Sequence, residues 1–144
     1  MKRRNFDPLL RTQPWKVVAV FQPIEHFLHK LEVDGTVETT GRHVVFQADV
    51  EKHWFDLVEA IRGVIQFHHI ARDRYGLDVN TEALERLTNK LDVAAPIFLG
   101  DIEAVRRDIA SCKQQALRLR LSQAEDILTT IRISAELDAA RAAA

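Results

Sequence analysis

The stretch VEKHWFDLVEAIRGVIQFHHIARDRY, residues 50–75, decides the fold predicted for this chain. Its apolar or half-apolar side chains recur in alternating steps of four and three residues, which places them on one face of an α-helix. The positions are Val50, Trp54, Leu57, Ile61, Val64, His68, Ala71 and Tyr75. Gly76 follows as the C-cap glycine that ends such a helix. The pattern predicts a central helix over about 50–75, roughly 38 Å long at about 1.5 Å per residue.

Other apolar residues widen this stripe well beyond a two-position coiled-coil seam. They are Phe55, Val58, Ile65, Phe67 and Ile70. A stripe of this width needs helices packed against more than one side of the central helix. Gly63 is the weak point of the pattern, because glycine inside a helix costs about 1 kcal/mol relative to alanine. We interpret it as a close helix crossing or a bend.

The composition is that of an ordinary globular domain. The 144 residues are 47% hydrophobic and 28% charged, and their net charge is −1. A chain of this length forms one domain, so we expect residues 1–144 to fold as a unit. No apolar run approaches the roughly 20 residues of a transmembrane helix, and the N-terminus lacks a signal-peptide hydrophobic region. We therefore expect a cytoplasmic protein without membrane contact.

Three further helices are predicted after Gly76. Asn80 is the expected N-cap of the first, Asp101 starts the second, and Ser122 starts the third in a capping-box pattern with Glu125. Their apolar stripes are Leu84, Leu87 and Leu91; then Ile102, Val105, Ile109, Cys112 and Ala116; then Ala124, Leu128, Ile131 and Ala135, widened by Ile127. Short connections imply antiparallel neighbours, so we predict a mainly α protein, a four- to five-helix bundle around residues 50–75. The alanine-rich residues 139–144 are expected to fray.

The N-terminal third is the least determined part of the sequence. Residues 15–21 are rich in valine and fit either a strand or a helical turn opened by Pro14. Pro23 fits the start of a helix that closes near Gly35. Residues 36–47 contain β-branched segments on both sides of Gly41, a pattern typical of a small β-hairpin. Whether residues 15–47 form strands or helices is left open.

Basic residues are concentrated at the N-terminus. Five cations against the single Asp7 give the first sixteen residues a formal charge of +4. We expect a flexible basic arm over about residues 1–13, a pattern found in proteins that contact nucleic acid and also in many that do not. The residues that would contact nucleic acid or another partner, from the arm and from the turn before Ser122, are Lys2, Arg3, Arg4, Arg11, Arg118 and Arg120.

Four side chains raise the question of a metal site. His26 and His29 are three residues apart, and His69 and Asp73 are four apart, so each pair shares one side of its predicted helix. If the two helices met, the four groups could surround a metal ion. The Glu-x-x-His units of di-iron bundles are absent, however, and six histidines give several chance pairs. We expect solvated or structural histidines, with no metal and no cofactor.

Two further residues lie on predicted core faces. His68 occupies the stripe of the central helix, which favours a buried, neutral imidazole hydrogen-bonded to the backbone. Cys112 lies between Ile109 and Ala116 on an apolar face, which favours a small core residue over a reactive thiol.

No recognised catalytic motif is present. The five glycines are scattered and form no phosphate loop, and no nucleophile elbow occurs. The sequence therefore favours a non-enzymatic helical interaction or regulatory module, an accessory protein that contacts another protein or a second copy of itself. The alternative is a nucleic-acid-associated accessory factor that uses the basic arm with Arg118 and Arg120. A histidine-based or metal-dependent enzyme is the third hypothesis.

Overall fold

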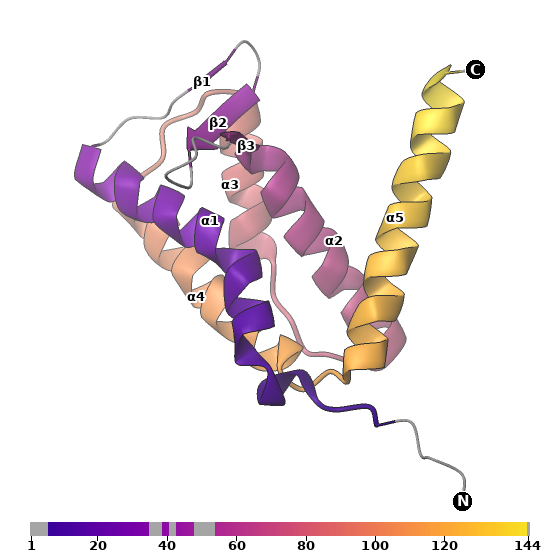
Figure 1. Cartoon of the computed structure of the whole chain (residues 1–144). Helices are drawn as coiled ribbons and strands as arrows, with labels where there is room; N and C mark the ends of the chain where they lie inside the picture. Colours follow the sequence, from indigo (N-terminus) through magenta and orange to yellow (C-terminus); the bar gives the residue numbers. More distant parts are fainter. Residues whose placement is uncertain (1–5, 35–38, 41–42, 48–53, 144) are drawn as a thin grey trace, which may run out of the picture.

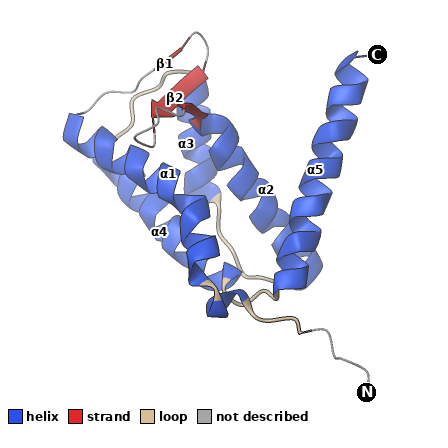
Figure 2. Ribbon diagram, in the orientation of Figure 1, coloured by secondary structure: helices blue, strands red, loops and turns tan. Residues whose placement is uncertain are grey.

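The computed structural model describes residues 6–34, 39–40, 43–47 and 54–143. Its helices are α1 (Pro14–Asp34), α2 (Leu57–Tyr75), α3 (Glu82–Asp92), α4 (Leu99–Ala116) and α5 (Leu121–Ala143), preceded by a short 3-10 helix, Leu10–Thr12. Helices α1, α3 and α5 pack against α2, and α4 packs against α1 and α3. Figures 1 and 2 show α5 leaning away from α2 towards the C-terminal end of α5. The predicted mainly helical bundle is therefore confirmed. No helix among the described residues is long and apolar enough to cross a membrane.

Short strands lie between α1 and α2. They are β1 (Thr39–Thr40), β2 (His43–Gln47) and β3 (Trp54–Asp56), paired antiparallel in the order β1-β2-β3. Phe46 is opposite Phe55, and Val45 is opposite Asp56. The hairpin predicted over 36–47 depends on a turn at Gly41, which lies outside the described residues, so that hairpin stays a prediction.

The central helix is shorter than predicted. It begins at Leu57, and Trp54, expected on the helical stripe, belongs to β3 instead. Asp56 ends the strand and caps the helix, because its Oδ1 accepts a hydrogen bond from the backbone N–H of Glu59 at 3.2 Å. Residues 50–53 lie outside the described part of the chain. At the other end Gly76 adopts the left-handed conformation, with φ 71°, as predicted for a C-cap.

Helix α1 is continuous through Pro23, so the prediction that Pro23 opens a separate helix is wrong. Pro14 occupies the first helical position, where its missing N–H costs nothing. Pro23 removes one internal hydrogen bond, and the helix axis bends part way along (Figure 1). A buried stripe crosses the proline without a break and stabilises the helix on both sides of it. Its members are Val17, Phe21, Ile24, Leu28 and Leu31.

Helices α3 and α4 follow the predicted stripes. Every apolar position predicted for them is buried. The N-cap of α3 is Thr81, one residue after the predicted Asn80, although Oδ1 of Asn80 does accept a hydrogen bond from the N–H of Glu82 at 3.0 Å. Helix α4 begins at Leu99, two residues before the predicted Asp101, whose carboxylate accepts from the N–H of Phe98 at 2.8 Å. Lys90 of α3 binds the same carboxylate at 2.6 Å and joins the two helices.

Helix α5 departs from prediction at both its cap and its stripe. Ser122 does not cap it; the N–H and Oγ of Ser122 donate to the carboxylate of Asp7, at 3.0 and 2.6 Å. Of the predicted stripe, Ala124 and Ile127 are buried, while Leu128 and Ala135 are exposed. The helix continues to Ala143, through the alanine-rich segment expected to fray. It is therefore a long helix of which only the first half is packed.

Candidate functional site

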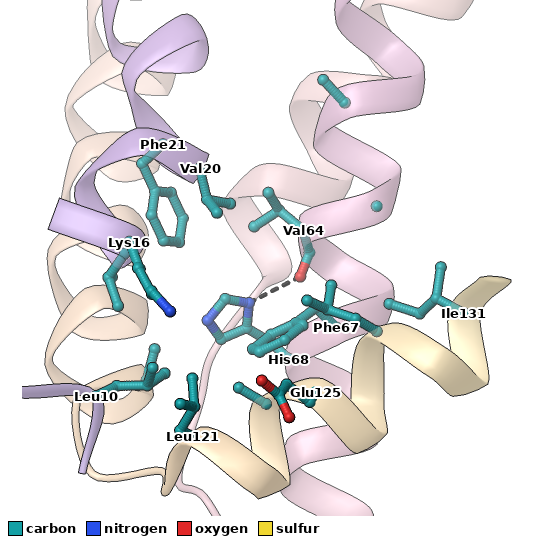
Figure 3. A pocket seen from close by; sticks show the side chains of 16 residues that line it. Leu10, Lys16, Val20, Phe21, Val64, Phe67, His68, Leu121, Glu125 and Ile131 are labelled. Carbon is teal, nitrogen blue, oxygen red and sulfur yellow. Dashed lines mark hydrogen bonds between the residues drawn. The ribbon is translucent and has the colours of Figure 1, made fainter. Parts of the chain in front are cut away.

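An apolar groove of about 490 Å³ runs between α1, α2 and α5. Figure 3 shows it from close by. Its lining residues from α1 are Lys16, Val17, Val20 and Phe21; from α2 Ala60, Gly63, Val64, Phe67 and His68; from α5 Leu121, Ala124, Glu125, Leu128 and Ile131; with Leu10 and Ala116 at one end. This volume lies within the range of protein binding pockets.

The floor of the groove is a face of α2 that carries small side chains. Ala60 and Gly63 lie one turn apart, with Phe67 one turn further along. A Cβ placed on Gly63 would meet no atom within 4 Å, so the space above the glycine is open. Gly63 therefore faces the groove, and no neighbouring helix of the described chain crosses α2 at this point. The sequence-based interpretation of a close crossing within the chain is therefore wrong.

The walls of the groove are apolar and accessible. Val20 on α1 and Leu128 on α5 are 54% and 57% exposed, although both project from helices whose other faces are buried. The exposed Lys16 and Glu125 line the same groove, one from α1 and one from α5. The site thus combines an apolar interior with one cation on one wall and one anion on the other.

A polar cluster holds α5 at the C-terminal end of α2 and sets the position of one wall. Asp126 accepts hydrogen bonds from Arg74 and from the hydroxyl of Tyr75, each at 2.6 Å. Arg74 also donates to Thr130 at 3.0 Å. The Tyr75 hydroxyl and the Arg74 guanidinium lower the pKa of Asp126, so this carboxylate stays ionised. Thr130 is the last polar anchor and Ile131 the last apolar residue packed against the core, and beyond them α5 leaves the body of the protein.

The N-terminal segment closes one end of the groove. The N–H of Leu10 donates to the carbonyl of Leu119, and the N–H of Leu121 donates to the carbonyl of Pro8, each at 2.8 Å. Leu10 is buried. The two hydrogen bonds from Ser122 lower the pKa of Asp7, which keeps its negative charge at the N-terminus of α5. Much of the segment predicted to be a flexible arm is thus fixed against the α4–α5 turn.

His68 lies beside the groove in the buried, neutral form that the sequence predicted. It is 2% exposed, and its Nδ1–H donates to the carbonyl of Val64 at 2.8 Å. Phe21 and Phe67 pack against the ring, with centroids 5.8 and 5.3 Å away. Burial lowers the pKa of His68, and this outweighs the opposite effect of the Val64 and Cys112 carbonyls. The imidazole belongs to the α2 floor of the groove and is enclosed by the two phenyl rings.

Cys112 is also held in an unreactive form. Its side chain is fully buried on α4. Burial, reinforced by the negative charge of Asp108, raises the pKa of the thiol to about 12. A thiol needs access and a positive surrounding to become a nucleophile, and Cys112 has neither. The prediction of a small core residue is confirmed.

The structure does not gather the four side chains considered for a metal site. Nε2 of His69 lies 2.9 Å from Oγ1 of Thr81, and Asp73 pairs with Arg72 at 3.0 Å. His26 and His29 lie exposed on α1. Across the described ranges, no three histidine, cysteine or acidic side chains are close enough to hold a metal ion.

The residues predicted to contact nucleic acid or another partner are only partly described. Lys2, Arg3 and Arg4 lie outside the described residues. Arg11, Arg118 and Arg120 are exposed and come to the same end of the molecule, because the backbone of Leu10 pairs with that of Leu119. Arg120 donates to the carbonyl of Asp7 at 3.1 Å, and Arg118 to Oε1 of Gln115 at 3.5 Å.

No protein-family model, curated protein or solved structure matches this chain. The groove therefore has to be interpreted from its own geometry. Sequence reasoning missed it because the α5 stripe was assigned to the core, although Leu128 and Ile131 do form an apolar face. The available signal was the small pair Ala60 and Gly63 on α2, which leaves space that a core helix would normally fill.

Proposed function

We propose that the protein is a non-enzymatic helical interaction module, and that it acts by holding an amphipathic helix in the groove between α1, α2 and α5. The observation that carries the proposal is the groove itself, an apolar channel with two helical walls and an α2 floor in which Ala60 and Gly63 leave open space. Helix-in-groove recognition uses such a surface, with apolar anchors at helical spacing on the bound helix.

The open space above the α2 floor favours a helix over a flat protein surface as the ligand of the groove. Open space above Gly63 allows a backbone to approach α2 closely, at the distance where side-chain ridges enter grooves. Exposed apolar side chains on both walls, such as Val20 and Leu128, would be covered by the bound helix. Lys16 and Glu125 supply opposite charges, which would select the orientation of that helix.

The same geometry favours binding over chemistry. Among the side chains that could take part in a reaction, Lys16, Glu125 and His68 line the groove, whereas Cys112 is buried on α4 outside its lining. Burial holds His68 and Cys112 in their neutral forms. The thiolate of a catalytic pair is therefore not available from Cys112 at neutral pH. An apolar interior is suited to covering side chains of a partner.

Photocrosslinking in the native host tests the proposal. A photoreactive phenylalanine replaces Leu128, which is exposed and lines the groove. The matched control places it at Thr129, which is exposed on α5 but does not line the groove. We expect position 128, and not position 129, to cross-link to a helical protein segment identified by mass spectrometry. Equal labelling at both positions, or no protein product from position 128, would contradict the proposal.

Nucleic-acid binding is the second candidate. It is favoured by the backbone pairing that brings Arg11, Arg118 and Arg120 to one end of the molecule. Contacts of this kind would give an affinity that falls steeply with salt. The test is fluorescence anisotropy with labelled duplex DNA and single-stranded RNA over a salt series, comparing Arg118→Ala/Arg120→Ala with the control Arg107→Ala on α4. Binding lost in the double variant alone would support this function, and salt-independent or unchanged binding would exclude it.

A further inference from the structure

The outer segment of α5, residues 132–143, has no cover from the described part of its own chain. All of its residues except Ser134 are exposed. The segment is roughly 18 Å long at about 1.5 Å per residue. Isolated helices shorter than about 12–15 residues are marginal in water. The outer segment continues a helix that is packed as far as Ile131 and so needs no separate nucleation, but its own apolar side chains are left exposed to water.

The outer segment also carries an apolar stripe of its own. Ile133, Leu137 and Ala140 are spaced by four and three residues, so they share one face. At about 100° per residue, this face is distinct from the one that Ala124 and Ile131 present to the groove. Ile133 and Leu137 are 47% and 53% exposed. The outer segment is thus an amphipathic helix with two large apolar anchors one turn apart.

We propose that the helix bound in the groove is the outer segment of α5 from a second copy of this chain. This inference rests on the proposed function and names its partner. Two such molecules would interlock, because each has an open groove and each projects an uncovered helix (Figure 1). The exchange is reciprocal, so both grooves are filled by one two-fold symmetric contact and no uncovered helix is left to extend the assembly.

The charges agree with this assignment. The groove offers the exposed Lys16 on one wall and the exposed Glu125 on the other. The outer segment carries carboxylates at Glu136 and Asp138 and guanidinium groups at Arg132 and Arg141. Arg132 lies 4.0 Å from Glu136 and Arg141 lies 3.9 Å from Asp138, so each flank of the outer segment carries both signs. A helix lying between the walls can therefore place an opposite charge beside either wall, but such exposed pairs contribute little to affinity.

Light scattering and sedimentation over a concentration series test the inference. We expect the wild type to dimerise and Leu137→Glu to remain monomeric at the same concentration, because a carboxylate would enter an apolar floor. Thr129→Glu introduces the same charge on another face of α5 and should dimerise like the wild type. Circular dichroism checks that each variant keeps its helices. A monomeric wild type, or a Leu137→Glu variant that dimerises normally, would overturn the inference.

Changing the groove supplies an independent pair of variants. Gly63→Leu fills the floor, into space that the structure leaves open, and should abolish dimerisation. Gly63→Ala adds only a methyl group and should keep it. Mixing Leu137→Glu with Gly63→Leu is the decisive measurement, because the first retains an intact groove and the second retains an intact outer segment. The mixture should form a heterodimer through one of the two contacts, weaker than the wild-type dimer.

Failure of this inference can be told apart from failure of the proposed function. A mixture of the two variants that stays monomeric would mean that α5 does not enter the groove of a second copy. If position 128 still cross-links to a different protein, the groove binds a helix from that protein and the proposed function stands. If position 128 cross-links to residues 132–143 of this chain, both proposals are supported.

Discussion

Helices α4 and α5 carry apolar stripes of similar clarity, yet one is buried throughout and the other is not. On α4 every position from Ile102 to Ala116 in the predicted stripe is buried against α1 and α3. On α5 burial ends after Ile127, and Leu128 is 57% exposed. The difference teaches that a periodic stripe indicates that a helix has a partner surface, but not whether the same chain supplies it.

The largest expected contrast is in thiol reactivity, because Cys112 lies in the buried stripe of α4. We expect a thiol reagent to label native Cys112 slower than the unfolded chain by on the order of a thousandfold or more, since labelling requires opening of the structure. Placing a cysteine at Leu128 in a Cys112→Ala background gives the matched α5 position, which should react rapidly in the monomer. Mass spectrometry over time follows both reactions. Rapid native labelling of Cys112 would contradict the burial of the α4 stripe.

The next contrast is in stability. Ile109→Ala removes a side chain that is almost completely buried on α4, and should lower the free energy of unfolding by about 2–5 kcal/mol. Leu128→Ala on α5 should cost less than about 0.5 kcal/mol in the monomer. Urea unfolding at low protein concentration measures both. Equal losses would mean that the α5 stripe is buried within the single chain after all.

A smaller effect is expected from pH, through the buried face of α2 that carries His68. The pKa of His68 is lowered by burial, so the unfolded chain, with an ordinary pKa near 6.5, binds a proton that the folded protein resists. Stability should therefore fall as pH drops through about 6.5, and level off below the folded pKa. Urea unfolding between pH 7 and 5 should show this dependence weakened in His68→Gln. The same slope in both proteins would contradict the assignment.

The smallest effect is expected on the groove face of the same helix. Gly63→Ala should raise the free energy of unfolding by about 0.5–1 kcal/mol, because alanine favours the helix and its Cβ meets no neighbouring atom. Thermal unfolding at low concentration measures the gain. A loss of stability would show that the space above Gly63 is filled in solution even in the monomer.

Much of the helical part of the fold could be predicted, because helix stripes and caps are local features. The stripes of α3 and α4 and the glycine at the end of α2 follow from residue spacing alone, whereas the N-cap of α3 was predicted one residue too early, at Asn80 instead of Thr81. The start of α2 was predicted too early because Trp54 continues the periodicity by chance. Asp56 followed by Glu59 was the competing signal, a capping pattern placed inside the stripe.

The remaining differences between the prediction and the structure arise from contacts between segments that are far apart in the sequence. Pro23 is typical of a helix start, but the stripe from Val17 to Leu31 is buried by other helices and outweighs the lost hydrogen bond. The pairing of Asp7 with Ser122 joins residues more than a hundred positions apart, and no local pattern indicates it. The groove could not be predicted because it depends on where the anchors of α5 stop.

The backbone pairing of residues 8–10 with residues 119–121 also constrains the order in which parts of the protein fold. During synthesis the helices α1 to α4 are complete before the second member of this pairing has left the ribosome. Residues 8–10 must therefore wait until more than a hundred further residues have been made, and long-range contacts of this kind form slowly. A nascent chain halted before Leu119 would leave Leu10 exposed and the carboxylate of Asp7 without its donor, Ser122. Formation of this junction therefore distinguishes a completely folded chain from a partly folded one.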